Sequence, residues 1–112
     1  MEPSDGWIGV DLDGTLAYLG SQIPEVIGPP IPEMMDRVRN WLQKGYQVKI
    51  FTARASVPEQ IPIVRQWLRN HDLPELEITN AKDFGMIECW DDRSVEVIAN
   101  TGRPANPLRN RT

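Results

Sequence analysis

Two pairs of aspartates are the residues of this chain whose spacing points to chemistry. Asp11 and Asp13 stand one residue apart in VDLDGTLA, directly after the apolar run WIGV, and Asp91 and Asp92 follow MIECW. In an extended segment, residues i and i+2 project to the same side, so Asp11 and Asp13 leave the end of a buried strand together. Like charges this close repel each other, unless a cation lies between them or one of them is protonated.

Simpler explanations exist for both pairs. An EF-hand loop that begins at Asp11 needs glycine at its sixth position and glutamate at its twelfth, and this chain has Leu16 and Gln22 there, which excludes it. A capped turn remains open for the first pair. For Asp91 and Asp92, the alternative is the N-cap of a helix that follows them.

Composition limits the classes of protein that fit. The chain has 112 residues, 40% of them hydrophobic, and a net charge of −4, which predicts one small domain over residues 1–112 and no extensive nucleic-acid binding. No apolar run approaches the roughly 20 residues of a membrane span, and MEPSDG does not resemble a signal peptide. The single cysteine, Cys89, and the single histidine, His71, exclude an internal disulfide and make histidine-based zinc or Ser-His-Asp sites untenable. We therefore expect a cytoplasmic protein without membrane association.

Apolar periodicity alternates between strand and helix along the chain. We predict strands at residues 7–10, 47–51, 75–78 and 86–90, and helices at 32–45, 58–70 and 94–99. Residues 16–32, rich in glycine and proline, are expected to form a flap-like loop or short hairpin, and residues 103–112 an irregular tail. Pro62 leaves the start of the second helix open, His71 should lie at its end, and Cys89 is expected to be a buried small hydrophobe.

The candidate residues fall at one edge of the predicted sheet. Strands that alternate with helices form a parallel sheet, and ligands bind at the carboxyl ends of its strands. Asp11 and Asp13 follow the first strand, Thr52 follows the second, and the Asp91 pair follows the fourth. A lone lysine in a loop, such as Lys82 before the fourth strand, is by itself usually just solvated.

Four motifs in order, DLDGTLA, FTAR, TNAK and CWDD, resemble those of haloacid-dehalogenase-like (HAD) phosphohydrolases. The resemblance covers residues 7 to about 102. It implies an α/β, three-layer Rossmann-like fold with a short parallel sheet flanked by helices. The segments between the motifs are too short for a cap domain, so the chain looks like a small capless member of bacterial or phage type.

The resemblance also implies a role for each motif residue. Asp11 would be the nucleophile that forms an aspartyl-phosphate, and Asp13 the general acid and base. Thr52 would offer its hydroxyl and amide, and Lys82 a positive charge, to the transferring group. The implied catalytic residues are Asp11, Asp13, Thr52 and Lys82, and the phosphate-binding set is Asp11, Leu12, Asp13, Thr52, Ala53 and Lys82.

Mg²⁺ is the cofactor that the resemblance implies. Its ligands would be Asp11, Asp91 and Asp92, with the backbone carbonyl of Asp13. Which carboxylate of Asp91 and Asp92 binds the ion directly stays open. Arg54 in FTAR either touches the substrate or bridges to an acidic neighbour.

Two other functions use similar residues. A phosphorylatable receiver domain places its acidic pair first and its acceptor aspartate mid-chain, and it lacks a carboxylate two residues after the acceptor; here the order is reversed and Asp13 is present. A catalytically silent HAD-like adaptor is the third possibility. For the leading hypothesis, the partner is a phosphorylated small molecule or polymer end, and a homo-oligomer is compatible with an open, capless site.

Overall fold

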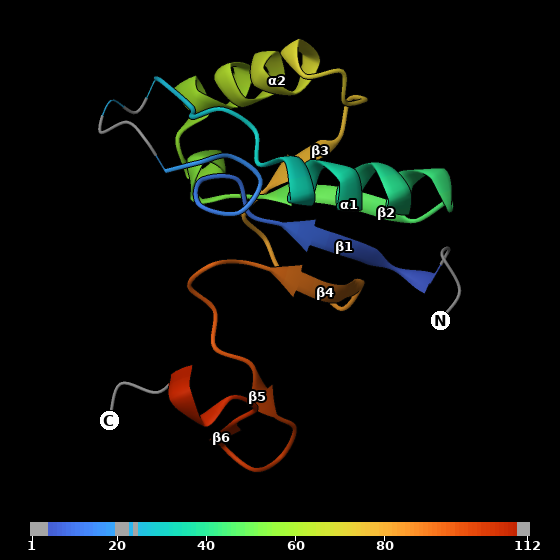
Figure 1. Cartoon of the computed structure of the whole chain (residues 1–112), viewed down its shortest axis with the longest axis vertical. Helices are drawn as coiled ribbons and strands as arrows, with labels where there is room; N and C mark the ends of the chain where they lie inside the picture. The colour runs from blue at the N-terminus through green and yellow to red at the C-terminus, as the bar shows by residue number, and fades with distance from the viewer. Residues whose placement is uncertain (1–4, 20–22, 24, 110–112) are drawn as a thin grey trace.

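The computed structural model of the protein describes residues 5–19, 23 and 25–109 (Figure 1). A four-stranded parallel sheet has the order β3-β2-β1-β4. Its strands are β1 (Trp7–Val10), β2 (Gln47–Phe51), β3 (Glu77–Thr79) and β4 (Met86–Trp90), and its helices are α1 (Pro32–Gln43) and α2 (Ile61–Asn70). The predicted α/β class with a short parallel sheet is confirmed.

Both helices cover the same face of the sheet. The crossovers from β1 through α1 to β2, and from β2 through α2 to β3, step the same way along the sheet, and right-handed connections then place both helices on one side. One buried cluster joins alternate strand residues to the apolar faces of both helices: Ile8, Val10, Val48, Ile50, Met34, Met35, Val38, Val64, Trp67 and Leu68. In the described part of the chain α1 and α2 are the only α-helices, so the third layer that the resemblance implies is not confirmed.

The ends of α1 follow from proline and glycine. Pro32 occupies the first turn, where its missing N–H leaves no bond unmade. The helix stops before Gly45, whose φ of +88° turns the chain toward β2 at no steric cost. Trp41 and Leu42 of this helix are partly buried and pack against the core.

The second helix begins later than residue 58. The segment after β2 instead forms two short 3-10 turns, η2 (Ala53–Ser56) and η3 (Pro58–Gln60), before α2 starts at Ile61. Pro62 explains the difference, because proline is tolerated only in the first turn of a helix. His71 follows α2 as expected, and its ring packs against Trp67 with 4.6 Å between ring centroids.

The C-terminal segment departs from its prediction. The expected helix at 94–99 is wrong: β5 (Val97–Ile98) pairs antiparallel with β6 (Arg103–Pro104), and η4 (Pro107–Arg109) follows. Asn100 (φ 67°) and Gly102 (φ 73°) make the turn between them, and the β-branched residues before it favour a strand. Figure 1 shows this pair beyond β4, outside the main sheet.

Two further expectations are modified by the sheet. The third strand is shifted to Glu77–Thr79, because its pairing with β2 aligns Lys49 with Glu77. Cys89 is exposed rather than buried, since β4 is an edge strand. In the described part of residues 16–32, two segments pair as the arms of a hairpin: the amide of Tyr18 donates to Pro29 O (2.8 Å) and that of Ile31 to Leu16 O (2.8 Å). Residues 20–22 and 24 lie outside the described residues.

The sheet face opposite the helices is partly filled by aromatic side chains. Trp7, only 3% exposed, packs against Phe51 with 6.3 Å between ring centroids. Its Nε1 donates to Asp83 Oδ1 (2.8 Å), and the Lys49 ammonium lies 4.5 Å from the centre of its ring. No helix among the described residues is long and apolar enough to cross a bilayer.

Candidate functional site

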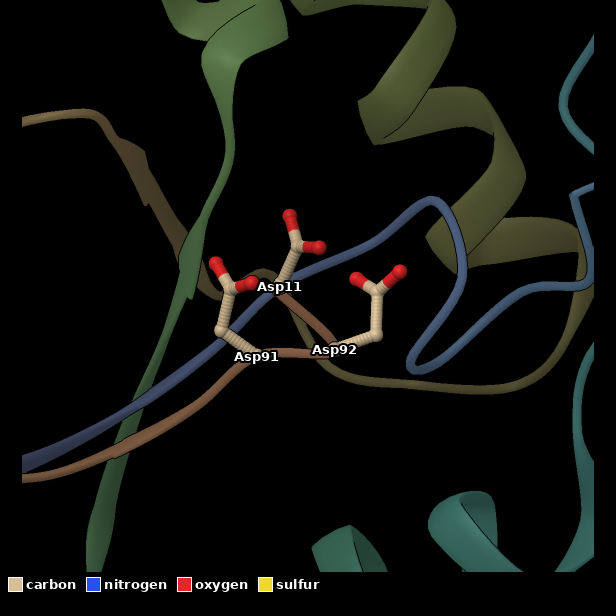
Figure 2. Close-up of side chains that lie close together, drawn as sticks. All are labelled: Asp11, Asp91 and Asp92. Atoms are coloured by element: carbon tan, nitrogen blue, oxygen red, sulfur yellow. The ribbon is translucent and has the colours of Figure 1, made fainter. Parts of the chain in front are cut away.

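The first and last strands of the main sheet bring three carboxylates together at one edge. The pairing of β1 with β4 continues past the strand ends, where the Asp11 amide donates to Trp90 O (2.9 Å). Asp91 and Asp92 come next in the chain and therefore lie beside Asp11 (Figure 2). One carboxylate oxygen from each of the three residues lies within 4.8 Å of the others.

This crowding changes the acidity of Asp11. Burial, then the charge of Asp91, a hydrogen bond to Asp92 and the charge of Asp92, raise the pKa of Asp11 from 3.8 to about 7, against the opposing effect of the Leu12 amide. Each of the effects that raise this pKa disfavours the ionised form of Asp11. A cation among the three carboxylates would remove that penalty.

Asp13 is not part of the carboxylate cluster. Arg54 donates from Nε to Asp13 Oδ2 (2.7 Å) and from Nη2 to Asp13 Oδ1 (2.9 Å), and from Nη1 to Gln60 Oε1 (2.6 Å). The hydrogen bond to Asp13 is also the main cause of a raised Arg54 pKa. Of the two roles left open for Arg54, the structure shows the bridge to an acidic neighbour. Metal binding through the backbone carbonyl of Asp13 stays a prediction.

A tight turn after Asp11 places Thr15 and Gly14 against Asp92. The Gly14 amide donates to Ala17 O (2.7 Å), and Gly14 has a φ of +91°. A Cβ at Gly14 would lie 2.6 Å from Asp92 Oδ2, so glycine is required here for both conformation and space. Thr15 Oγ1 accepts from the Asp92 amide (3.1 Å) and donates to Asp92 Oδ1 (3.4 Å). Sequence reasoning missed Thr15; its place in the DGT motif is the available signal.

Thr52 is buried at the end of β2, and only part of its predicted role is open to it. Its amide donates to Thr79 O (2.9 Å), so the expectation that this amide faces a phosphoryl group is wrong. Its Oγ1 accepts from the Arg54 amide (3.1 Å), which leaves the hydroxyl proton to donate. The next residue, Ala53, is exposed, and it lines a cleft at this edge together with Thr52.

Two clefts meet at the carboxyl edge. The first, about 540 Å³, is lined by five residues of the predicted site: Asp11, Asp13, Thr52, Ala53 and Asp91. The second, about 680 Å³, runs over β4 and contains the exposed Lys82. Three residues line both clefts: Phe51, Asp91 and Ser94.

Several other residues lie at or beside the carboxyl edge of the sheet. Leu12 is fully buried, so only its backbone can serve the site. Asp91 Oδ1 accepts from the Arg93 amide (2.7 Å), in a local turn rather than a helix cap. Asn80 and Arg93 also line the first cleft, and sequence reasoning did not single them out. Burial and the charge of Asp91 raise the pKa of the Cys89 thiol, which keeps it protonated.

Comparison with family models, curated proteins and solved structures finds no match. A functional assignment for this chain therefore rests on its own motifs and on the geometry of the carboxyl edge.

Proposed function

We propose that the protein is a Mg²⁺-dependent phosphomonoesterase that acts through an aspartyl-phosphate on Asp11. The observation that carries this proposal is the convergence of the carboxylates of Asp11, Asp91 and Asp92. Asp11 and Asp91 line the cleft that also holds Asp13 and Thr52. The order of the four motifs supports the same reaction. We expect the protein to act in the cytoplasm on a phosphorylated small molecule or polymer end.

The donor set fits a small hard cation. Asp11, Asp91 and Asp92 supply only oxygen ligands, the type that Mg²⁺ prefers, and their mutual repulsion makes the cation favourable. The Asp13 carbonyl is the further ligand that the resemblance implies. When bound, the ion would supply positive charge that shields the phosphate from the Asp11 carboxylate.

The side chains of the first cleft divide the reaction between them. Asp11 attacks phosphorus, a bond forms between its carboxylate oxygen and phosphorus, and the bond to the ester oxygen breaks. Asp13 gives a proton to the leaving oxygen and then takes one from the water that cleaves the aspartyl-phosphate. Arg54 holds Asp13 in place, and the Thr52 hydroxyl donates to a phosphoryl oxygen.

Hydrolysis of 4-nitrophenyl phosphate with Mg²⁺ tests the proposal. Turnover that stops in EDTA, returns with Mg²⁺ and is lost in Asp11→Asn is the expected result. A receiver domain would instead accept one phosphoryl group from an acyl phosphate and retain it, and a silent adaptor would do neither. Either of these two results would contradict the proposal.

A further inference from the structure

We propose that the second cleft binds the leaving group of the phosphomonoester, and that this group is an uncharged aromatic or heteroaromatic moiety that lies on Phe51. The inference rests on the proposed function. The two clefts adjoin each other, because Phe51, Asp91 and Ser94 line both. A phosphate held beside Asp11 and Thr52 therefore has its ester group directed either to solvent or along the second cleft.

Phe51 is placed to contact such a group. It is the last residue of β2 and directly precedes Thr52, so the aromatic ring and the phosphate-binding hydroxyl are neighbours in the chain. Val48 and Ile50 face the helices, and alternation then places Phe51 on the opposite face of the sheet. The ring is half-buried, which leaves one part packed and another available.

The packed part of Phe51 fixes its orientation. Trp7 packs against it at an interplanar angle of 55°. Gly9 leaves the room for this arrangement, because a Cβ there would lie 2.7 Å from Met86 Cε and 3.3 Å from Phe51 Cβ. A ring held by its neighbours loses little conformational entropy when a ligand stacks on it.

The second cleft offers no net charge to the leaving group. Asp91 is a ligand of the proposed ion, and the carboxylate of Glu88 accepts from Trp90 Nε1 (3.1 Å) on the α1 side of the sheet. The charged side chains that remain in the lining are Glu96 and Lys82. One carboxylate and one ammonium do not offset the desolvation of a second phosphate or a carboxylate on the leaving group. Its apolar lining, which includes Phe51 and Val95, favours a flat uncharged group instead. The substrate class is thus a monophosphate ester of an uncharged aromatic or heteroaromatic alcohol.

Benzyl, ethyl and 4-carboxybenzyl phosphate test this assignment, because all three are esters of primary alcohols. For the wild type we expect the KM of benzyl phosphate to be about tenfold below that of ethyl phosphate, as an aromatic contact allows. The added carboxylate of the third ester should remove most of this advantage. Glu96→Gln should restore part of it, because Lys82 is then the remaining charged side chain of this cleft. These comparisons do not depend on altering Phe51.

Phe51→Leu then tests the ring itself. It should raise the KM of benzyl phosphate about tenfold with kcat and inhibition by inorganic phosphate unchanged, and Phe51→Tyr should retain the wild-type KM. Phe84→Leu is the matched control, since Phe84 is fully exposed and lines neither cleft.

The outcomes separate the two proposals. No hydrolysis of any of these esters would overturn the proposed phosphomonoesterase activity and this inference with it. Hydrolysis with equal KM values for benzyl and ethyl phosphate, or tighter binding of the carboxylated ester, would overturn only the assignment of the second cleft.

Discussion

Arg54 holds both carboxylate oxygens of Asp13, with Nε 2.7 Å from Oδ2 and Nη2 2.9 Å from Oδ1. The two side chains are 15% and 30% exposed, so water competes little for this pair. A guanidinium with two parallel bonds fixes the plane of the carboxylate as well as its position. Arg54 is thus a positioning residue for the proposed acid and base.

Exchanging Arg54 for lysine should keep the charge and lose the two-bond geometry. We expect kcat for an alkyl phosphate to fall about 10- to 100-fold, part of what general acid–base catalysis contributes, with KM little changed. Arg65→Lys is the control, because Arg65 pairs with an exposed carboxylate, Glu75, at 3.2 Å. A fall in both variants, or in neither, would contradict the role given to Arg54.

Asp11→Asn should abolish turnover and leave the fold intact, because the change preserves size and removes the proposed nucleophile. We expect kcat to fall about a thousandfold or more. Circular dichroism of the variant checks that it folds. Asp36→Asn, an exposed aspartate on α1, should behave as the wild type. Near wild-type turnover in the Asp11 variant would show that the mechanism is wrong.

The raised pKa of Asp11 predicts how stability depends on pH without metal. The folded chain holds this proton more tightly than the unfolded chain, so the stability it contributes is present below about pH 4 and is lost as pH rises through about 7. In EDTA, Asp11→Asn should therefore melt higher than the wild type at pH 8. The difference in Tm should shrink toward pH 4. An unchanged difference across this range would exclude the proposed repulsion.

Mg²⁺ should raise the Tm of the wild type, because it binds the folded carboxylate cluster and not the unfolded chain. The shift should be larger at pH 8 than at pH 5, where Asp11 carries a proton. Ca²⁺ should support turnover poorly, because its larger and looser shell lets Asp11 bind through both oxygens. Full turnover in chelator would rule out a metal requirement.

Gly14→Ala should damage the site more than conformational strain alone explains. Gly14 and Gly102 both have positive φ (91° and 73°), but a Cβ at Gly14 would meet Asp92 Oδ2 at 2.6 Å, and one at Gly102 would meet nothing within 4 Å. We expect both alanine variants to lose about 1 kcal/mol of stability from strain. Only Gly14→Ala should also weaken Mg²⁺ binding, measured by calorimetry. Equal Mg²⁺ affinities would contradict the placement of Asp92.

Local signals predicted the main sheet and α1 well. The strands Trp7–Val10, Gln47–Phe51 and Met86–Trp90 have the predicted bounds, because short apolar runs end there at polar or glycine residues. The structure of residues 94–104 was harder to predict from the sequence. Asn100 and Gly102, both with positive φ, form a turn there that outweighs the helical periodicity of residues 94–99. The exposure of Cys89 could not be predicted either, because sequence periodicity does not show that β4 lies at the edge of the sheet.

The carboxylate cluster could be predicted because strand ends in a parallel sheet meet at one edge. Contacts across loops could not. The hydrogen bonds from Thr15 to Asp92 and from Arg54 to Asp13 join residues 77 and 41 positions apart, and no periodic pattern reports them. The Thr52 amide was misjudged for the same reason, because its partner, Thr79, lies on a strand whose register is set by tertiary pairing.

The neighbours β1 and β4 are the first and last strands of the main sheet along the chain. During synthesis, Asp11 emerges early, but its partners Asp91 and Asp92 arrive only after both helices have left the ribosome. Closure of so long a loop is a late and entropically costly event in folding. Metal affinity therefore reports the docking of β4, and a nascent chain that has packed α1 and α2 would still be unable to bind the ion. A bound ion would, in turn, tie this edge strand to the centre of the sheet and oppose its fraying.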